Sequence, residues 1–423
     1  MTRQQPMWPT VTFGDLLQVK HGFAFKGEFF SDNPGEVVLT PGNFEAEGGL
    51  KFRSEKDRSY AGPYPADFRL SAGDLIVVMT DLTQEARILG SAAFVPDAIT
   101  CLHNQRLGKI VNLDTARLDR RFAYYIFNSR GFREAVKATA SGSTVKHTAP
   151  GRICAYSFNL PPLPIQRRIA SILGAYDDLI EVNRRRIAVL EEMARRLFDE
   201  WFVHFRFPGH EGHEMVETEQ GRLPKGWTWA PFGTLCADVR DTVAPSEVDP
   251  ATPYVGLEHI PRRSTTLDAW GRSDEVTSTK HRFQAGDILF GKIRPYFHKV
   301  AWAPFAGVCS SDAIVIRPKK PEIAGLVLAV ASSDRFVATA VQTSNGTKMP
   351  RANWAVLERY PVPLPPTPLP AKASHAVGAW VRLAAALHAA NARLAASRDL
   401  LLPRLISGDL AVDAAEANLE QAA

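Results

Sequence analysis

The chain has 423 residues, 45% of them hydrophobic and 22% charged, with a net charge of +5; these values describe a globular protein of roughly two to three domains. Its four cysteines lie too far apart for a Cys-x-x-Cys metal site and are typical of buried thiols in a reducing compartment. No apolar run reaches the length of a membrane span and no apolar signal core follows Met1, so we expect a cytoplasmic protein without a membrane partner.

The first predicted unit, residues 1–160, recurs in altered form over residues 227–364. Trp8 and Trp227, each five residues before a Phe-Gly pair, are 219 positions apart. The Ala-Gly-Asp triplets at 72–74 and 285–287 are 213 apart, and the two Leu-Pro-Pro sequences that end the units are 204 apart. Loops of unequal length produce such a shrinking offset in a duplicated unit. The pattern predicts an internal repeat with pseudo-twofold symmetry.

Each unit mixes short strand-like runs with turns. Gly73 and Asp74 precede an apolar run at 75–79, which predicts a turn leading into a buried strand. Apolar residues on one face predict a helix over residues 118–137. The second unit repeats the strand-rich pattern, so we expect an α+β protein with two similar α/β domains.

Two proline-rich hinges each precede a long stretch of helical periodicity, because prolines fix their own φ and disfavour helix in the preceding residue. The first helix is predicted over residues 166–201, and the second over 371–402, with Pro403 and Gly408 marking its end. The predicted division is 1–160, the first domain; 161–205, the first hinge and helix; 206–226, a linker; 227–364, the second domain; 365–410, the second hinge and helix; and 411–423, a tail.

Apolar side chains recur every seven residues along both helices, which indicates a packing seam. Between residues 166 and 201, seven arginines balance seven acidic residues, a pattern typical of a helix that pairs with other helices. We expect two helices of about 50 Å, at ~1.5 Å per residue, to pair as an antiparallel coiled coil that acts as a ruler between the two domains. Asn183 either fixes the register of this pair or lies at its solvent-exposed edge. The predicted seam residues are Ile169, Leu173, Tyr176, Ile180, Asn183, Ile187, Leu190, Leu197 and Trp201 in the first helix, and Trp380, Leu387, Leu394 and Leu401 in the second.

No catalytic motif is complete. Residues 286–292 have the spacing of a phosphate-binding loop, but Ile293 stands where a hydroxyl must reach magnesium. Residues 213–217 begin like a zinc-protease motif but end in Glu217 instead of histidine. We therefore expect neither catalytic residues nor a metal site in this chain.

Basic residues gather in matched parts of the two units. Residues 101–152 hold ten basic and three acidic side chains, and residues 280–299 hold five basic and one acidic. Such patches suit DNA, although an ordinary solvated face gives the same counts. Loops there carry Arg, Asn and Gln, which can discriminate base pairs, and Lys, Ser and Thr, which suit phosphates. The predicted contacts to double-stranded DNA are Thr80, Gln84, Arg87, His103, Asn104, Gln105, Arg106, Ser143, Thr144, Lys146 and His147 in the first unit, and Lys292, Arg294, Tyr296, Ser310, Ser311, Asn345, Thr347, Lys348 and Arg351 in the second.

The first hinge and helix carry a family resemblance. The sequence Leu-Pro-Pro-Leu-Pro-Ile-Gln-Arg-Arg-Ile-Ala-Ser-Ile-Leu at 160–173, with Asp-Asp-Leu-Ile-Glu-Val-Asn at 177–183 and Leu-Phe-Asp-Glu-Trp-Phe-Val at 197–203, resembles the specificity subunit of type I restriction–modification systems. Leu-Pro-Lys-Gly-Trp at 223–227 and Leu-Leu-Pro-Arg-Leu-Ile-Ser-Gly at 401–408 are similar to later segments of that family. The resemblance extends over nearly the whole chain. Where the family commonly has Glu-Gln, this chain has Ile165-Gln166, and the second hinge has neither residue and reads Pro370-Ala371-Lys372, so the residues that hold the partner subunit are not assigned.

The resemblance implies a non-catalytic chain that binds no cofactor. Each target-recognition domain would read one half of a split, asymmetric DNA site, and the helices would set the spacer. Two methyltransferase (modification) subunits would bring S-adenosylmethionine, and restriction subunits would bring Mg²⁺ and ATP-driven translocation. Two alternatives stay open: a self-sufficient DNA methyltransferase or nuclease with an unrecognised catalytic site, and a coiled-coil scaffold whose domains no longer bind DNA.

Overall fold

The structure is a computed structural model that describes residues 8–52, 57–346 and 348–416. The chain forms two compact units, which differ in extent from the repeated units of the sequence and are called unit 1 and unit 2 from here on. Unit 1 contains Met1–Asp178 and Ala395–Ala423, and unit 2 contains Leu179–Leu394. Each unit therefore combines one strand-rich domain with part of each long helix, and the boundary falls inside both helices. The domain limits drawn from the sequence stay a prediction.

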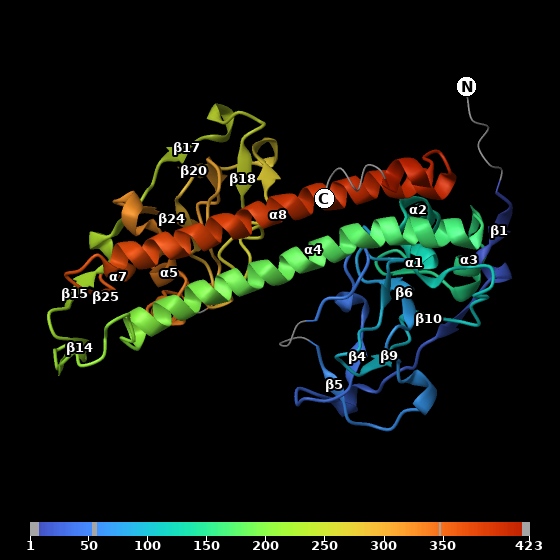
Figure 1. Cartoon of the computed structure of the whole chain (residues 1–423), viewed down its shortest axis with the longest axis horizontal. Helices are drawn as coiled ribbons and strands as arrows, with labels where there is room; N and C mark the ends of the chain where they lie inside the picture. Colours follow the sequence, from blue (N-terminus) through green and yellow to red (C-terminus); the bar gives the residue numbers. More distant parts are fainter. Residues whose placement is uncertain (1–7, 53–56, 347, 417–423) are drawn as a thin grey trace. The chain divides into compact units, whose positions relative to one another are not determined.

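Unit 1 contains two four-stranded sheets (Figure 1). In one sheet all neighbours are antiparallel, in the order β2 (Gln18–His21), β10 (Leu107–Val111), β6 (Leu75–Val78) and β8 (Ala92–Phe94). In the other the order is β3 (Phe30–Ser31), β5 (Ser59–Tyr60), β4 (Val37–Leu39) and β9 (Cys101–His103), with β4 and β9 parallel. Two short ladders pair β1 (Thr10–Thr12) with β12 (Ser157–Asn159), and β7 (Thr80–Asp81) with β11 (Lys146–His147). The strand predicted after Gly73 and Asp74 is confirmed as β6, whose four residues are all buried.

The single helix predicted over residues 118–137 is wrong, because the structure has two. Helix α1 (Arg120–Asn128) ends at Ser129, and α2 (Arg130–Ala138) begins immediately after it. Ser129 has extended dihedral angles (φ −69°, ψ 148°), and its hydroxyl accepts a hydrogen bond from the amide of Phe132. Serine is a favoured N-cap, so it starts a new helix without disturbing the apolar periodicity. A short helix, α3 (Pro150–Cys154), completes the domain.

Unit 2 has a similar order of elements, but its second sheet has five strands and differs in the place of its first strand. Its antiparallel sheet has the order β16 (Cys236–Asp238), β24 (Ala313–Pro318), β21 (Ile288–Gly291) and β22 (Val300–Trp302). Its second sheet has the order β17 (Thr242–Val243), β20 (Lys280–Phe283), β23 (Gly307–Cys309), β18 (Pro253–Val255) and β19 (Gly271–Arg272), with β18 and β23 parallel. Strand β15 (Thr228–Pro231) pairs with β25 (Pro361–Leu364). The helices are α5 (Ala324–Ala331), α6 (Asp334–Gln342) and α7 (Trp354–Leu357), and Ser333 caps α6 as Ser129 caps α2.

The repeated Phe-Gly pairs are explained by the cores. Phe13 and Phe232 are both fully buried. The ring of Phe13 lies 5.8 Å from that of Phe132, and the ring of Phe232 lies 4.9 Å from that of Phe336. Phe132 and Phe336 are 204 positions apart, the offset seen in the sequence at this part of the repeat. Burying each such ring contributes about 2–3 kcal/mol, so the repeat preserves a core contact.

The long helices extend further than predicted. Helix α4 (Leu163–Phe198) begins within the first hinge and continues as a π-helical segment, Asp199–Val203. The residues predicted as a linker then form a short hairpin of β13 (Met215–Val216) and β14 (Leu223–Pro224). Helix α8 (Leu369–Ser407) continues through Pro403, so the prediction that Pro403 ends the helix is wrong. An interior proline removes one hydrogen bond, which a helix of this length tolerates; Gly408, at φ +82°, does follow the last helical residue.

The predicted seam residues of the first helix are buried over the first two thirds of its length. Ile169, Leu173, Tyr176, Ile180, Asn183 and Ile187 are buried, whereas Leu190, Leu197 and Trp201 are half-buried. In the second helix the predicted positions Trp380, Leu387, Leu394 and Leu401 are only half-buried. Its buried apolar positions include Ala373, Val377, Val381, Ala384, Leu402 and Leu405. The heptad assignment for this helix was therefore displaced, because alanine-rich runs give little contrast between faces.

Asn183 is buried, and its side-chain amide donates a hydrogen bond of 2.9 Å to Oδ1 of Asn391. The exposed-edge alternative for Asn183 is therefore excluded. In the part of the chain that the structure describes, no single helix is long and apolar enough to cross a membrane, although one sharply bent pair, Pro321–Ala331 with Asp334–Gln342, meets the length and composition criteria.

Candidate nucleic-acid interface

Three of the loops predicted to contact DNA converge on one residue of unit 1. Met79 follows strand β6, and its amide donates a hydrogen bond of 2.9 Å to the carbonyl of Arg106. The carbonyl of Met79 accepts a hydrogen bond of 2.9 Å from the amide of Thr148. The backbone of Met79 thus joins the loops at 80–87, 103–106 and 141–148.

The first of these loops is shaped by Asp81. Its carboxylate is buried and accepts hydrogen bonds from the amides of Thr83 and Ile88, at 2.9 and 2.8 Å. These bonds close the loop and leave Gln84 and Arg87 exposed. Thr80 is itself buried, with its hydroxyl 3.0 Å from Nδ1 of His147, so its predicted direct contact with DNA is corrected to a supporting role.

His103 does not reach the surface, which corrects its predicted contact with DNA. Its ring is fully buried, and Nε2–H donates a hydrogen bond of 2.9 Å to the carbonyl of Leu107. Burial lowers the pKa of His103 to about 4, so the ring is neutral at pH 7. The neighbouring Gln105 and Arg106 are exposed, and Oδ1 of Asn104 accepts a hydrogen bond from the amide of Arg106.

The third loop of unit 1 turns at Gly142. Its φ is +99°, and a Cβ at this position would lie 2.0 Å from the carbonyl oxygen of Val145. Only glycine fits there without a shift of the backbone. The turn leaves Ser143, Thr144 and His147 exposed and Lys146 half-buried, beside the loop closed by Asp81.

The same convergence recurs in unit 2 at Lys292, which is 213 positions after Met79. The amide of Lys292 donates a hydrogen bond of 2.8 Å to the carbonyl of Asp312, and its carbonyl accepts one of 2.9 Å from the amide of Ala352. Asn345 and Arg351 exchange a pair of backbone hydrogen bonds that closes the third loop. Backbone bonding therefore gives both units the same arrangement of three loops.

In unit 2 these loops surround a hollow of about 480 Å³. Four predicted residues line it: Lys292, Ser311, Asn345 and Arg351. Four polar or charged residues that the sequence reasoning missed line it too: Asp238, Arg240, His281 and Asn353. The basic count over 280–299 pointed toward His281, but nothing in the sequence linked Arg240 or Asn353 to this place, because each lies on a separate element.

The charges in this hollow are only partly neutralised internally. Arg240 pairs with Asp238 at 2.7 Å, whereas Arg351 approaches Asp312 only to 3.7 Å. Nδ1 of His281 is buried and has no hydrogen-bond partner among the described residues. A concave surface with Arg, Lys, Asn and His side chains can accept phosphates and base edges.

The other predicted residues of unit 2 that the structure describes do not line this hollow. Arg294 is half-buried in a left-handed conformation (φ +50°), and Tyr296 beyond it is exposed. The hydroxyl of Ser310 accepts a hydrogen bond from the amide of Asp312, which shapes the turn. Lys348 is exposed, and Thr347 lies outside the described residues.

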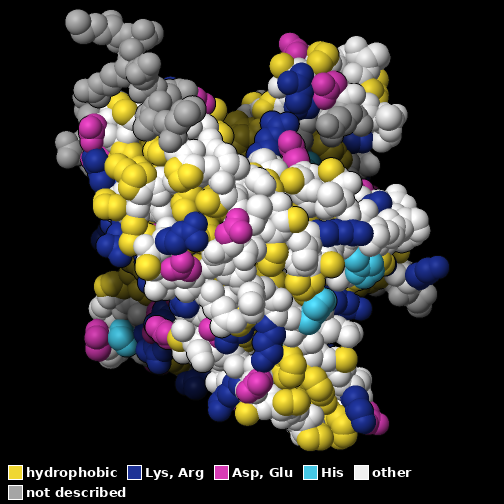
Figure 2. All heavy atoms as spheres, turned by 90° about the vertical axis from the view of Figure 1, so that its right-hand side faces the viewer, with side chains coloured by type: hydrophobic (Ala, Val, Ile, Leu, Met, Phe, Trp, Pro, Cys, Tyr) yellow, Lys and Arg dark blue, Asp and Glu magenta, His cyan; other side chains and the backbone are white. Residues whose placement is uncertain are grey.

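Figure 2 shows Lys and Arg side chains interspersed with acidic and uncharged ones over the face in view. Attraction to a polyanion on this face must therefore come from local groups of side chains, since charges of opposite sign alternate over it.

The hinge residue Gln166 forms its hydrogen bonds within unit 1. Its side chain is fully buried and donates hydrogen bonds of 2.8 Å to the carbonyls of Arg117 and Pro161. Its Oε1 accepts a hydrogen bond of 2.8 Å from the amide of Asp119. All three hydrogen bonds lie within unit 1, so Gln166 holds the start of α4 against the first domain.

The chain is similar to known proteins in sequence and in fold. A family model for the type I restriction modification DNA specificity domain matches residues 7–192 and 249–370. The chain is 28% identical over 270 residues to the type I restriction enzyme EcoDI specificity subunit of Escherichia coli, covering 58% of this chain and 59% of that protein, so the match spans less than two thirds of this relative. It is 23% identical over 347 residues to the MjaIX specificity subunit of Methanocaldococcus jannaschii, covering 78% and 77%. The crystal structure of the S subunit of a type I restriction–modification system from M. genitalium shares the fold, with a TM-score of 0.58 at 15% identity over 96% of this chain and 98% of that one.

Proposed function

The chain belongs to the type I restriction–modification DNA specificity family, and from that premise we propose that it is the subunit that reads the DNA sequence for partner enzymes. Each domain would read one half of a bipartite, asymmetric site. The observation that carries this proposal is the convergence of three loops on Met79 in unit 1 and on Lys292 in unit 2. We call each set of three loops, with the residue that joins them, a frame. Two frames with the same backbone hydrogen bonds and different side chains suit two different half-sites.

The side chains at these frames support sequence reading. Arg106 and Gln105 in unit 1, and Arg351 and Asn345 in unit 2, are exposed on the converging loops. Arg can donate two hydrogen bonds to guanine, and the side-chain amide of Asn or Gln can donate one hydrogen bond to adenine and accept one from it. Lys292 and the serine and threonine hydroxyls suit phosphates, which position a protein on the duplex.

The long helices would set the distance between the half-sites as an antiparallel coiled coil with pseudo-twofold symmetry. Contacts within each unit support this. In unit 2, Asn183 contacts Asn391. Further along α4, Ala194 lines a pocket together with Trp380 of α8. In unit 1, Asp177 contacts Arg398. As the residue numbers increase along α4, those of the contacting residues decrease along α8, as they do in antiparallel helices.

We propose that catalysis belongs to partners. Two methyltransferase subunits would supply S-adenosylmethionine and transfer its methyl group, and restriction subunits would use ATP and Mg²⁺. The chain would present the site and contribute no reacting group.

A reconstitution assay tests this division. The purified chain is incubated with S-adenosylmethionine, Mg²⁺ and DNA, alone and with methyltransferase subunits, and methylated positions are mapped. We expect methylation at one bipartite sequence only when the partners are present. Methyl transfer or cleavage by the chain alone would overturn the proposal in favour of a self-sufficient enzyme.

A further inference from the structure

A partly buried ionic network joins three helices within unit 1. The hydroxyl of Tyr125, on α1, donates a hydrogen bond of 2.6 Å to Oδ2 of Asp177, on α4. Nη1 of Arg398, on α8, donates one of 2.6 Å to the other carboxylate oxygen. The side chain of Arg398 is only 14% exposed and that of Asp177 29%. One carboxylate therefore ties the recognition domain to both long helices.

Both partners of Asp177 respond to this environment. Burial and the carboxylate of Asp177 raise the pKa of Tyr125 above its usual value, so the phenol stays protonated as a donor. Burial opposes the charge of Arg398, but hydrogen bonds with Asp177 and Asp399 hold its pKa above the usual value. Partly desolvated charged groups that hydrogen-bond to one another hold a fixed geometry, because a displacement leaves a charge without its partner.

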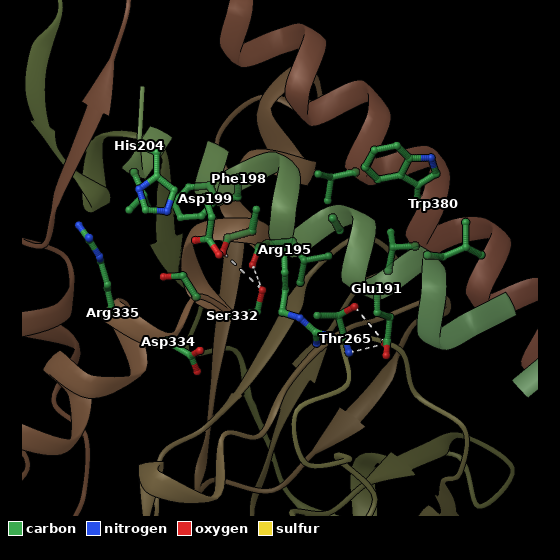
Figure 3. Close-up of a pocket in the computed structure, with 18 residues that line it drawn as sticks. Glu191, Arg195, Phe198, Asp199, His204, Thr265, Ser332, Asp334, Arg335 and Trp380 are labelled. Carbon is green, nitrogen blue, oxygen red and sulfur yellow. Dashed lines mark hydrogen bonds between the residues drawn. The ribbon is translucent and has the colours of Figure 1, made fainter. Parts of the chain in front are cut away.

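The repeat places different residues at the equivalent positions of unit 2. An offset of 204 relates Tyr125 to Ala329, Asp177 to Val381 and, in the reverse direction, Arg398 to Ala194. These three small apolar residues line a hollow of about 240 Å³ between α4, α5 and α8 (Figure 3). None of these three positions carries a charged side chain, so they cannot form an equivalent of the network of unit 1.

Unit 2 uses one different polar contact nearby. Glu191, on α4, accepts hydrogen bonds of 2.7 Å from the hydroxyl of Ser264 and the amide of Thr265. Figure 3 shows Glu191 directed toward Thr265 at one side of the hollow. This contact reaches a loop, whereas the network of unit 1 reaches the helix that precedes the capping Ser129.

We propose that Tyr125, Asp177 and Arg398 are positioning residues that fix the first recognition domain on the helix pair and thereby make the complex selective for spacer length. This inference rests on the proposed function. One base pair of spacer changes the separation of half-sites by about 3.4 Å and their relative rotation by roughly 35°. A domain that can tilt on its helices tolerates such a change, and a domain held by the network does not.

The test compares methylation by the reconstituted modification complex on three DNA duplexes. They carry the native spacer, or one base pair more or less, between unchanged half-sites. The variants are Tyr125→Phe, which removes one hydroxyl, and Asp177→Asn, which removes the charge and keeps the shape. Glu181→Gln is the matched control, because Glu181 pairs with Arg185 at 2.9 Å on an exposed face of the same helix.

We expect the ratio of native-spacer to altered-spacer methylation to fall by about fivefold or more in Asp177→Asn, by less in Tyr125→Phe, and not at all in Glu181→Gln. Amide hydrogen exchange in α1 reports whether the domain stays folded. An unchanged ratio, or an equal loss of methylation on all three duplexes, would overturn the inference, because a merely stabilising contact lowers every rate alike. A wild-type complex that methylates none of the three would instead refute the proposed function.

Discussion

The three loops joined by Met79 in unit 1 and the three joined by Lys292 in unit 2 share the same backbone hydrogen bonds and differ in the side chain at the residue that joins them. Met79 and Lys292 make equivalent pairs of backbone hydrogen bonds to their neighbouring loops. Met79 is 1% exposed, whereas Lys292 is half-buried and lines a hollow. The two units therefore share the positions fixed by backbone hydrogen bonds and differ in the side chains presented there, which fits the proposed reading of two different half-sites.

The largest difference we expect is between strands β9 of unit 1 and β23 of unit 2, in their response to acid. His103 and Cys309 end the equivalent parallel strands β9 and β23, and both are fully buried. The pKa of His103 is lowered to about 4 by burial, below the value near 6.5 of an unfolded chain, so the unfolded state binds the proton first. The stability that the neutral ring contributes is complete above pH 6.5 and is lost as the pH falls toward 4, by on the order of 3 kcal/mol at ~1.4 kcal/mol per pH unit.

Amide hydrogen exchange of β9 and β23 between pH 7 and pH 4, corrected for intrinsic rates, measures this difference. Protection should fall further in β9 than in β23. The variant His103→Asn lacks the titrating ring and serves as the control. Equal losses in both strands of the unmodified protein would contradict the assignment.

A smaller difference is expected at the two glycine turns. Gly142 and Gly346 have φ values of +99° and +95°, but a Cβ at Gly142 meets a backbone oxygen at 2.0 Å, whereas one at Gly346 comes no closer than 3.3 Å. Gly142→Ala should lower the free energy of local opening by about 2 kcal/mol or more, and Gly346→Ala by about 1 kcal/mol. Hydrogen exchange of the Thr148 amide reports local opening of the frame in unit 1, and exchange of the Ala352 amide reports it in unit 2. A larger effect of Gly346→Ala than of Gly142→Ala would contradict this prediction.

The third prediction concerns the side chains at the frame centres. Lys292→Ala should lower kcat/KM for methylation by the complex about tenfold, because roughly 1.4 kcal/mol of DNA contact is lost. Met79→Leu should change it less than twofold, since a buried apolar side chain of similar volume is replaced. A larger loss in Met79→Leu would mean that the frame itself, rather than the side chain it presents, determines binding.

The sequence predicted the fold where apolar periodicity and turn residues agree. Strand β6 could be predicted because the residues that determine it are neighbours in the sequence. The equivalent positions of Phe13 and Phe232 could be predicted because the two segments repeat. The break at Ser129 and the continuation through Pro403 were missed, since capping leaves the apolar period intact and a long helix absorbs one lost hydrogen bond.

The candidate site was predicted less completely. Loops at matched places were identified, but their convergence on Met79 and Lys292 depends on pairing between distant strands. Arg240 and Asn353 come from elements outside the basic stretch, so charge counting could not find them. His103 was misassigned, because an imidazole between polar neighbours looks the same in a sequence whether it faces solvent or the core.

The most direct test of the two-reader account exchanges one domain. Residues 8–160 are replaced by the corresponding domain of a relative with another specificity, and methylation is mapped across a genome in cells that also express the methyltransferase subunits. We predict that one half-site changes while the other half-site and the spacer length stay the same. An unchanged site, or a change in both half-sites at once, would contradict the division of sequence reading between the two domains.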